Sequence, residues 1–148
     1  MPDHSKITST EKALQALQLA YENLREDRID QLLSLYAAEA LFKDPFHEVV
    51  GRNAIKTILI KMYAQLDSPS FKILSVLEKE FEASILWEFH FRFKRWGAKP
   101  QRFRGVSWIE WNEDFLIRSH IDYWDPAEGI YEQIPLLGSM MRLIKKNA

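Results

Sequence analysis

Apolar residues recur at helical spacing through the first part of the chain and predict three helices. A capping box at Thr8 and Glu11 opens the first, which we expect from about residue 9 to 25. A second apolar stripe predicts a short helix over 29–38, and a third predicts a helix over 51–66. Three helices therefore precede any large sheet.

Between the second and third helices, the pattern predicts a brief strand and a loop. The strand covers 40–43 and is stopped by Asp44 and Pro45, because proline disfavours helix in its predecessor and cannot donate to a strand ladder. The loop covers 46–50. A polar segment at 67–70 ends the third helix.

From residue 71 onward the apolar spacing changes to two, which is typical of half-buried strands. Four strands follow, marked by Phe71/Ile73, Trp87/Phe89/Phe91/Phe93, Val106/Trp108 and Ile117/Ile121. Turns fall at 97–100 and 112–114, and less clearly at 79–80. The tail over 127–148 predicts one or two short helices that close the fold.

Length and composition favour one domain over residues 1–148, with flexible residues 1–8. The chain has 148 residues, of which 47% are hydrophobic, enough for one sizeable core. Its 20 basic and 21 acidic residues give a formal net charge of -1, so we expect no nucleic-acid partner. The lack of cysteine fits a reducing cytoplasm, where we expect the protein to work. No apolar run approaches the roughly 20 residues of a membrane span.

The segment from Ser119 to Pro126 carries the most informative chemistry. Successive side chains of a strand point to opposite faces, so His120, Asp122 and Trp124 share one face. A histidine and a carboxylate side by side can exchange protons near neutral pH, provided that their face lines a pocket.

Counting cross-strand partners assigns the two faces of the sheet. We assume two-residue loops in both hairpins, the commonest length. One face then collects Glu88, His90, Arg92, Gly105, Ser107, Ile109, Arg118, His120, Asp122 and Trp124. The other collects Trp87, Phe89, Phe91, Phe93, Val106, Trp108, Ile117, Ile121 and Tyr123. Periodicity alone favours packing the aromatic face on the helices and turning the polar face to water. A loop of odd length would change this partition.

The order of these motifs resembles the nuclear transport factor 2-like superfamily, and its SnoaL-like branch most. Two helices, Phe42-Lys43-Asp44-Pro45, Gly51-Arg52-Asn53-Ala54-Ile55, the meander and Asp122-Tyr123-Trp124-Asp125 carry the resemblance. It implies an α+β cone, in which three N-terminal helices pack in a strongly curved, mostly antiparallel sheet and a short C-terminal helix follows. The cone would enclose an apolar-mouthed pocket.

The resemblance also reverses the assignment that periodicity favours, because it places the polar sheet face inside the cone. The aromatic face would then be left outside. Burying it between two copies is physically coherent, so we expect a homodimer through Trp87, Phe89, Phe91 and Trp108.

Two carboxylates match positions that carry chemistry in relatives of this kind. Asp44 sits where ketosteroid isomerases place the aspartate that shuttles a proton. Asp122 sits where limonene epoxide hydrolases and SnoaL-like cyclases place a strand carboxylate that acts as acid or base. The chain departs from both patterns, since Ser107 replaces the isomerase's oxyanion-binding aspartate and Tyr21 lies one position from its first-helix tyrosine. Glu88-x-His90 would replace the hydrolase's Arg-x-Asp.

These arguments select two groups of candidate site residues. We expect acid or base chemistry from Asp122, Asp44 and His120, and substrate contacts from Ser107, His90, Glu88, Trp124, His47 and Tyr21. A zinc site of His47, His90 and His120 is conceivable, yet no pair has a ligand spacing on one helix, so we expect neither metal nor cofactor.

Two functional hypotheses follow. The first is a small-molecule enzyme that performs isomerisation, cyclisation, hydration or dehydration on an apolar substrate. The second is a non-catalytic module of the same fold that binds an apolar ligand or a protein. Residues 140–146 add a side question, because their apolar and basic side chains could lie on a membrane surface. A capping helix or dimer contact is the favoured interpretation at this length.

Overall fold

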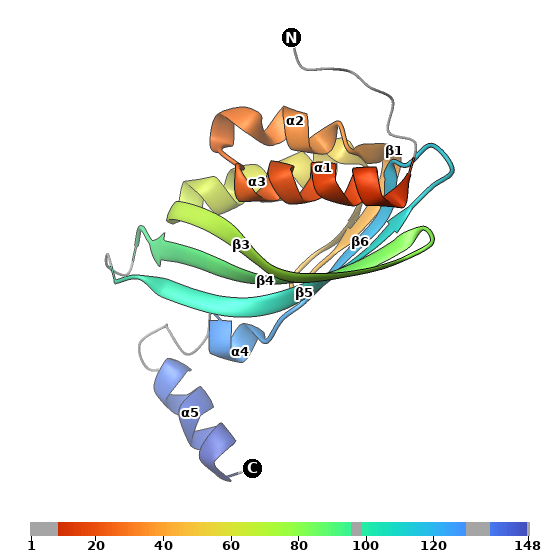
Figure 1. Ribbon diagram of the computed structural model, residues 1–148. Helices are drawn as coiled ribbons and strands as arrows, with labels where there is room; N and C mark the ends of the chain where they lie inside the picture. The colour runs from red at the N-terminus through yellow and green to blue at the C-terminus, as the bar shows by residue number, and fades with distance from the viewer. Residues whose placement is uncertain (1–8, 96–98, 130–136, 148) are drawn as a thin grey trace.

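The computed structural model describes residues 9–95, 99–129 and 137–147. It shows the expected α+β cone, in which helices cover the inner face of one strongly curved sheet (Figure 1). The prediction of flexible residues 1–8, and the first half of the predicted turn at 97–100, lie outside the described residues. Among those residues, no helix is long and apolar enough to cross a membrane.

Three α-helices pack in the cone. They are α1 (Thr10–Glu22), α2 (Ile29–Leu33), which a short 3-10 turn (Glu26–Arg28) precedes, and α3 (Arg52–Gln65). Ser9 caps α1, since its hydroxyl accepts a hydrogen bond from the backbone N–H of Lys12. Gly51 precedes α3 with a φ of 99°, a backbone conformation that side-chain-bearing residues rarely adopt. The predicted helices therefore exist, although the first two end earlier than expected.

The second helix gives way to a strand that the pattern did not predict at full length. Strand β1 spans Tyr36–Lys43, so the helix predicted to reach residue 38 is wrong over its last part. The backbone N–H of Ile117 donates to the carbonyl of Leu35, where β1 meets the last strand. Tertiary pairing thus outweighs the helix propensity of the alanines in this segment. The consequence is that Tyr36 lies on the sheet.

Six strands form the sheet in the order β2-β1-β6-β5-β4-β3. Besides β1, they are β2 (Glu48–Val50), β3 (Leu66–Lys79), β4 (Glu82–Phe93), β5 (Gln101–Trp111) and β6 (Ile117–Tyr123). Strands β3 to β6 are the predicted antiparallel meander, and β1 runs parallel to β6. The predicted loop at 46–50 contains the short edge strand β2, which pairs with β1.

Strand β3 begins five residues earlier than predicted. The polar segment 67–70 belongs to it, with an irregular register and a left-handed backbone at Ser68 (φ 51°). Pro69 is tolerated there because β3 is an edge strand, where one missing N–H does not break the ladder.

The register of β4 corrects the predicted face assignment. Seven residues, 94–100, connect β4 to β5, and this odd-length connection pairs Trp87 with Gly105 and His90 with Arg102. The side chains of Trp87, Phe89 and Phe91 therefore face the helices, where they are buried. The prediction that they form an outer dimer face is wrong, whereas Trp108 does lie on the outer face, 43% exposed.

Between Ser107 and Asp122, strands β5 and β6 face as predicted, although their connection is longer than the two residues assumed. The prediction is wrong at the start of β6, where Ile117 is buried and Arg118 is exposed. Residues 112–116 connect them, and a register shift between Glu110 and Trp111 offsets this odd length. Ser107 consequently pairs with Asp122, and Ile109 pairs with His120, all four on the concave face.

The chain ends in two helices below the sheet. Helix α4 (Pro126–Gly129) lies against β5, where a Cβ on Gly129 would come within 3 Å of the Phe103 ring. Helix α5 (Leu137–Asn147) projects away from the sheet (Figure 1).

Candidate active site

Two adjacent cavities occupy the inside of the cone. The outer one, about 340 Å³, lies between α3, the ends of β1 and β3, and the aromatic residues of β4 and β5. The inner one is smaller, about 30 Å³, and reaches Leu17 of α1. Tyr21, Phe71, Trp87 and Asp122 line both cavities, so Asp122 stands where they meet.

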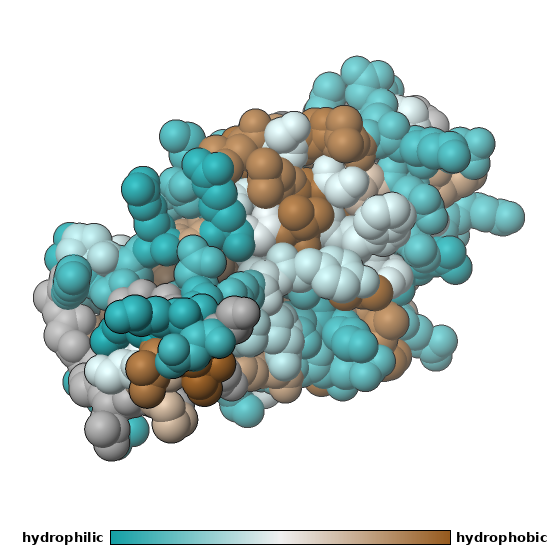
Figure 2. All heavy atoms as spheres, turned by 90° about the horizontal axis from the view of Figure 1, so that it is seen from below, coloured by the Kyte–Doolittle hydropathy of each residue, from teal (hydrophilic) through white to brown (hydrophobic). Residues whose placement is uncertain are grey.

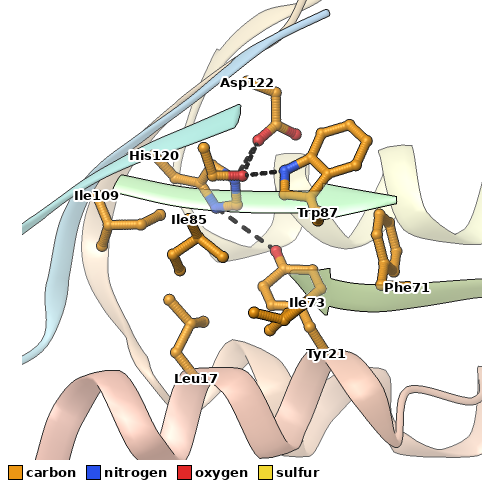
Figure 3. A pocket seen from close by; sticks show the side chains of 10 residues that line it. Leu17, Tyr21, Phe71, Ile73, Ile85, Trp87, Ile109, His120 and Asp122 are labelled. Carbon is orange, nitrogen blue, oxygen red and sulfur yellow. Dashed lines mark hydrogen bonds and ion pairs between the residues drawn. The ribbon is translucent and has the colours of Figure 1, made fainter. Parts of the chain in front are cut away.

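A chain of hydrogen bonds holds one oxygen of the Asp122 carboxylate (Figure 3). The Ser107 hydroxyl donates to Asp122 Oδ1 at 2.5 Å, and His120 Nε2 lies 2.6 Å from the same oxygen. The indole N–H of Trp87 donates to Ser107 Oγ at 2.8 Å, which leaves the hydroxyl hydrogen for the carboxylate. Asp122 Oδ2 accepts no hydrogen bond from the described residues.

Two tyrosines extend the chain behind His120. The hydroxyl of Tyr36 lies 2.7 Å from His120 Nδ1 and 2.6 Å from the hydroxyl of Tyr21. Burial raises the pKa of both tyrosines above the ordinary value of 10.0, and the negative charge of Asp122 adds to this shift. Both phenols therefore keep their protons at neutral pH and can donate them to hydrogen bonds.

These roles are mutually consistent when His120 is neutral and carries its proton on Nε2. That proton goes to Asp122, and Nδ1 accepts from Tyr36, which in turn accepts from Tyr21. His120 is only 2% exposed and lies against the Phe42 ring, so a fully satisfied neutral imidazole suits its surroundings.

A second carboxylate lies at the mouth of the outer cavity. Asp44 Oδ1 accepts from the backbone N–H groups of Phe46 and His47 and lies 2.9 Å from His47 Nδ1. Nearby, the rings of Phe46 and Phe103 contact Trp124 at centroid distances of 5.5 and 4.7 Å. Asp44, His47 and Trp124 thus line the entrance, and Asp44 is held largely by its own turn.

Comparison with known proteins places this geometry in a family. The model of the SnoaL-like domain matches residues 17–120, more than two thirds of the chain. The chain belongs to the SnoaL-like family. No curated protein sequence matches it significantly.

Solved structures share the fold of this SnoaL-like domain at low sequence identity. A candidate polyketide cyclase from Xanthomonas campestris is 15% identical with a TM-score of 0.72, over 84% of this chain and 96% of that one. A protein of ketosteroid isomerase-like fold from Catenulispora acidiphila, in complex with trimethylamine, is 16% identical, with a TM-score of 0.69 over 80% and 88%. A Mycobacterium tuberculosis protein in complex with estradiol-17β-hemisuccinate is 17% identical, with a TM-score of 0.65 over 81% and 97%.

Two residues that were predicted to contact the substrate lie on the outer face of this SnoaL-like domain and not in its pocket. Glu88 and His90 share the convex face of β4 with Arg104 of β5, so the prediction that they line the pocket is wrong. Glu88 lies 2.8 Å from His90 Nε2 and 3.1 Å from Arg104 Nε. The hydrogen bond from Arg104 is the main cause that lowers the pKa of Glu88 below its ordinary 4.5.

The structure does not bring His47, His90 and His120 together. His47 lies at the mouth, His90 lies on the convex face, and His120 lies deep on the concave face. Within the described ranges, no group of three histidine, aspartate or glutamate side chains is placed to hold a metal ion.

Tyr36 and Trp87 are the site residues that sequence reasoning missed. Tyr36 fell within a predicted helix, and Trp87 was assigned to the outer face. The position of Tyr36 on the same buried strand face as Ala40 and Phe42 is visible only in the structure. The facing of Trp87 depends on the length of a loop, which composition does not reveal.

Proposed function

We propose that this SnoaL-like domain binds a small apolar molecule in the cone and that Asp122 transfers a proton to or from it. One observation carries the proposal: a carboxylate has one oxygen fixed by two donors, while its other oxygen is left for a ligand within a largely aromatic cavity. Such a positioned group contributes roughly 100- to 10,000-fold in rate.

The reaction class that suits this arrangement is proton transfer at a carbon beside a carbonyl group. Asp122 Oδ2 takes the C–H proton, the electron pair of that bond moves into the carbonyl as an enolate, and Oδ2 returns the proton to the same or a neighbouring carbon. Ser107 and His120 hold Oδ1 in place throughout, and Tyr36 fixes the orientation of the His120 ring. An isomerisation or a cyclisation uses these steps.

The known complexes agree with a pocket for small ligands. Relatives in fold were crystallised with a steroid ester and with trimethylamine, although their low identity carries no ligand over to this chain. Phe71, Phe89 and Phe103 offer flat apolar surfaces to a ring-shaped ligand here. The missing cysteines suit a cytoplasmic protein, which we also propose.

Hydrogen–deuterium exchange of a simple bicyclic ketone tests the proposal. With 2-tetralone in D₂O, we expect the protein to accelerate exchange beside the carbonyl, as followed by NMR. Asp122→Asn should reduce this acceleration by roughly 100- to 10,000-fold. The matched control Glu88→Gln, on the convex face, should retain it. If folded Asp122→Asn accelerated exchange as much as the wild type does, Asp122 would not be the group that transfers the proton.

A binding module is the second candidate, and the state of Asp44 favours it. The Asp44 carboxylate, at the isomerase-like position, is held by backbone N–H groups of its own turn and by the His47 ring, which suits a structural role at the pocket entrance. Binding without exchange would favour this alternative, with 2-tetralone quenching the fluorescence of Trp87 and Trp124.

We also propose that two copies associate through the convex face of the sheet. Trp108 and Tyr123 are 43% and 60% exposed there, and the view from below shows a hydrophobic patch in its upper part (Figure 2). Sedimentation should show a dimer that Trp108→Arg converts to a monomer. A wild-type monomer at tens of micromolar would contradict the proposal.

A further inference from the structure

Helix α5 presents an exposed apolar row. Met140, Leu143 and Ile144 lie at positions i, i+3 and i+4 and therefore share one side of the helix, and each is more than half exposed. The helix projects from the rest of the chain (Figure 1). An apolar row of this kind is costly in water and calls for a surface to cover it.

The charge of α5 indicates what that surface is. Arg142, Lys145 and Lys146 repeat the same i, i+3, i+4 spacing on the opposite side of the helix and are exposed. Residues 137–147 contain no acidic side chain, whereas the whole chain is almost neutral at -1. Apolar residues on one side and only cations on the other are typical of helices that lie in the headgroup region of a membrane.

The length and position of α5 fit a helix that lies on a membrane. Eleven residues extend about 16 Å, which is too short to cross a bilayer. The helix follows α4, and α4 begins two residues after Trp124, a residue that lines the outer cavity. Eight residue steps from Gly129 to Leu137 span at most about 30 Å, so α5 stays within reach of the pocket mouth.

We propose that α5 docks the protein on an anionic lipid bilayer, with its apolar row in the interface and its cations near lipid phosphates. Docking there holds the mouth of the cone close to molecules dissolved in the membrane, which is where an apolar ligand partitions. The docking itself does not depend on the proton-transfer role of Asp122.

A second copy of the chain is the weaker alternative for covering α5. The convex sheet face is another exposed apolar surface, and it carries the exposed cations Arg104 and Arg118. Its acids Glu88 and Glu110 already pair with these cations, so they offer little to three further positive charges. Charge complementarity therefore favours a bilayer.

Flotation with lipid vesicles tests the proposal on the full chain. We expect binding to vesicles of phosphatidylcholine with 30% phosphatidylglycerol, weak binding to pure phosphatidylcholine, and release as NaCl rises from 50 to 500 mM. Arg142→Gln/Lys145→Gln/Lys146→Gln should weaken binding on the order of 100-fold. The matched control Lys12→Gln/Lys72→Gln/Lys79→Gln, which removes three exposed cations from the cone, should bind like wild type.

A second variant tests the apolar row, and circular dichroism checks that each variant is folded. Met140→Ser/Leu143→Ser/Ile144→Ser should also lose vesicle binding, while 2-tetralone exchange by the same variant in solution stays at the wild-type level. Absent flotation of the wild type, or equal binding to both lipid mixtures, would overturn the proposal. The proposal would also be overturned if the wild type bound no vesicles and formed a dimer that this variant converted to a monomer.

Discussion

The protein contains two histidine–carboxylate pairs with the same i, i+2 spacing on strands of one sheet, and they differ in almost everything else. His120 and Asp122 lie on the concave face, 2.6 Å apart, with side chains 3% and 18% exposed. Glu88 and His90 lie on the convex face, 2.8 Å apart, and the His90 side chain is 43% exposed.

The difference lies in what surrounds each pair. The hydroxyl groups of Ser107 and Tyr36 satisfy the inner pair, and the indole of Trp87 donates to Ser107 behind them. No arginine or lysine among the described residues bonds to Asp122. An arginine and solvent satisfy the outer pair. The inner carboxylate therefore has one oxygen that accepts no hydrogen bond from the described residues, whereas both oxygens of the outer one belong to an ordinary surface network. The local sequence does not distinguish the two pairs. Their surroundings differ because one strand turns its pair to the concave side of the sheet and the other turns its pair to the convex side.

The largest difference between the two pairs is expected when each histidine is replaced by alanine. His120→Ala removes one of the two hydrogen-bond partners of Asp122 Oδ1 and one of the two partners of the Tyr36 hydroxyl, and it empties a buried site. We expect this to lower the free energy of unfolding by about 3 kcal/mol. His90→Ala should hardly change it, since water replaces an exposed side chain. Urea unfolding of both variants measures this, and equal losses would show that facing is not what separates the pairs.

A smaller effect is expected from adding one methyl group to the concave face. The Cβ of Gly105→Ala would overlap the indole ring of Trp87, which must move, and with it the donor to Ser107. We expect a loss of about 1–3 kcal/mol in stability and a changed near-ultraviolet circular dichroism signal. Val106→Ile, one residue on and facing outward, serves as control and should change neither measurement.

The smallest expected effect is the pH dependence of the outer pair. Arg104 lowers the pKa of Glu88 from 4.5 in the folded protein, so the stabilisation is present above about pH 4.5 and is lost as pH falls through the lowered folded-state pKa. Wild type should therefore have a slightly higher urea midpoint than Glu88→Gln at pH 6.5, and the gap should shrink as the pH falls below the lowered pKa of Glu88. A gap that widens on acidification would contradict this sign.

Much of the fold was predictable because its patterns are local. Helical spacing located α1 and α3, and alternation located the meander. The end of α2 and the start of β1 were not predictable, because Tyr36 joins the sheet only through its pairing with β6. Pro69 was taken as a break, yet an edge strand accommodates it.

The candidate site was predictable in part for the same reason. Ser107, His120 and Asp122 come together because β5 and β6 face as the alternation indicated, and the resemblance directed that face inward. Tyr21 joins them from α1. Glu88 and His90 were predicted on the wrong face because the connection over 94–100 has seven residues and not the two that were assumed.

The sequence by itself determined the α+β class, the order of the elements and the carboxylate at the end of the last strand, because periodicity and turn residues act over a few positions. Only the tertiary structure decided which side chains share the inside of the cone. That choice depends on loop length, on one register shift near Trp111 and on a parallel pairing between distant segments. Each of them turns a whole strand face at once, since side chains alternate with a period of two.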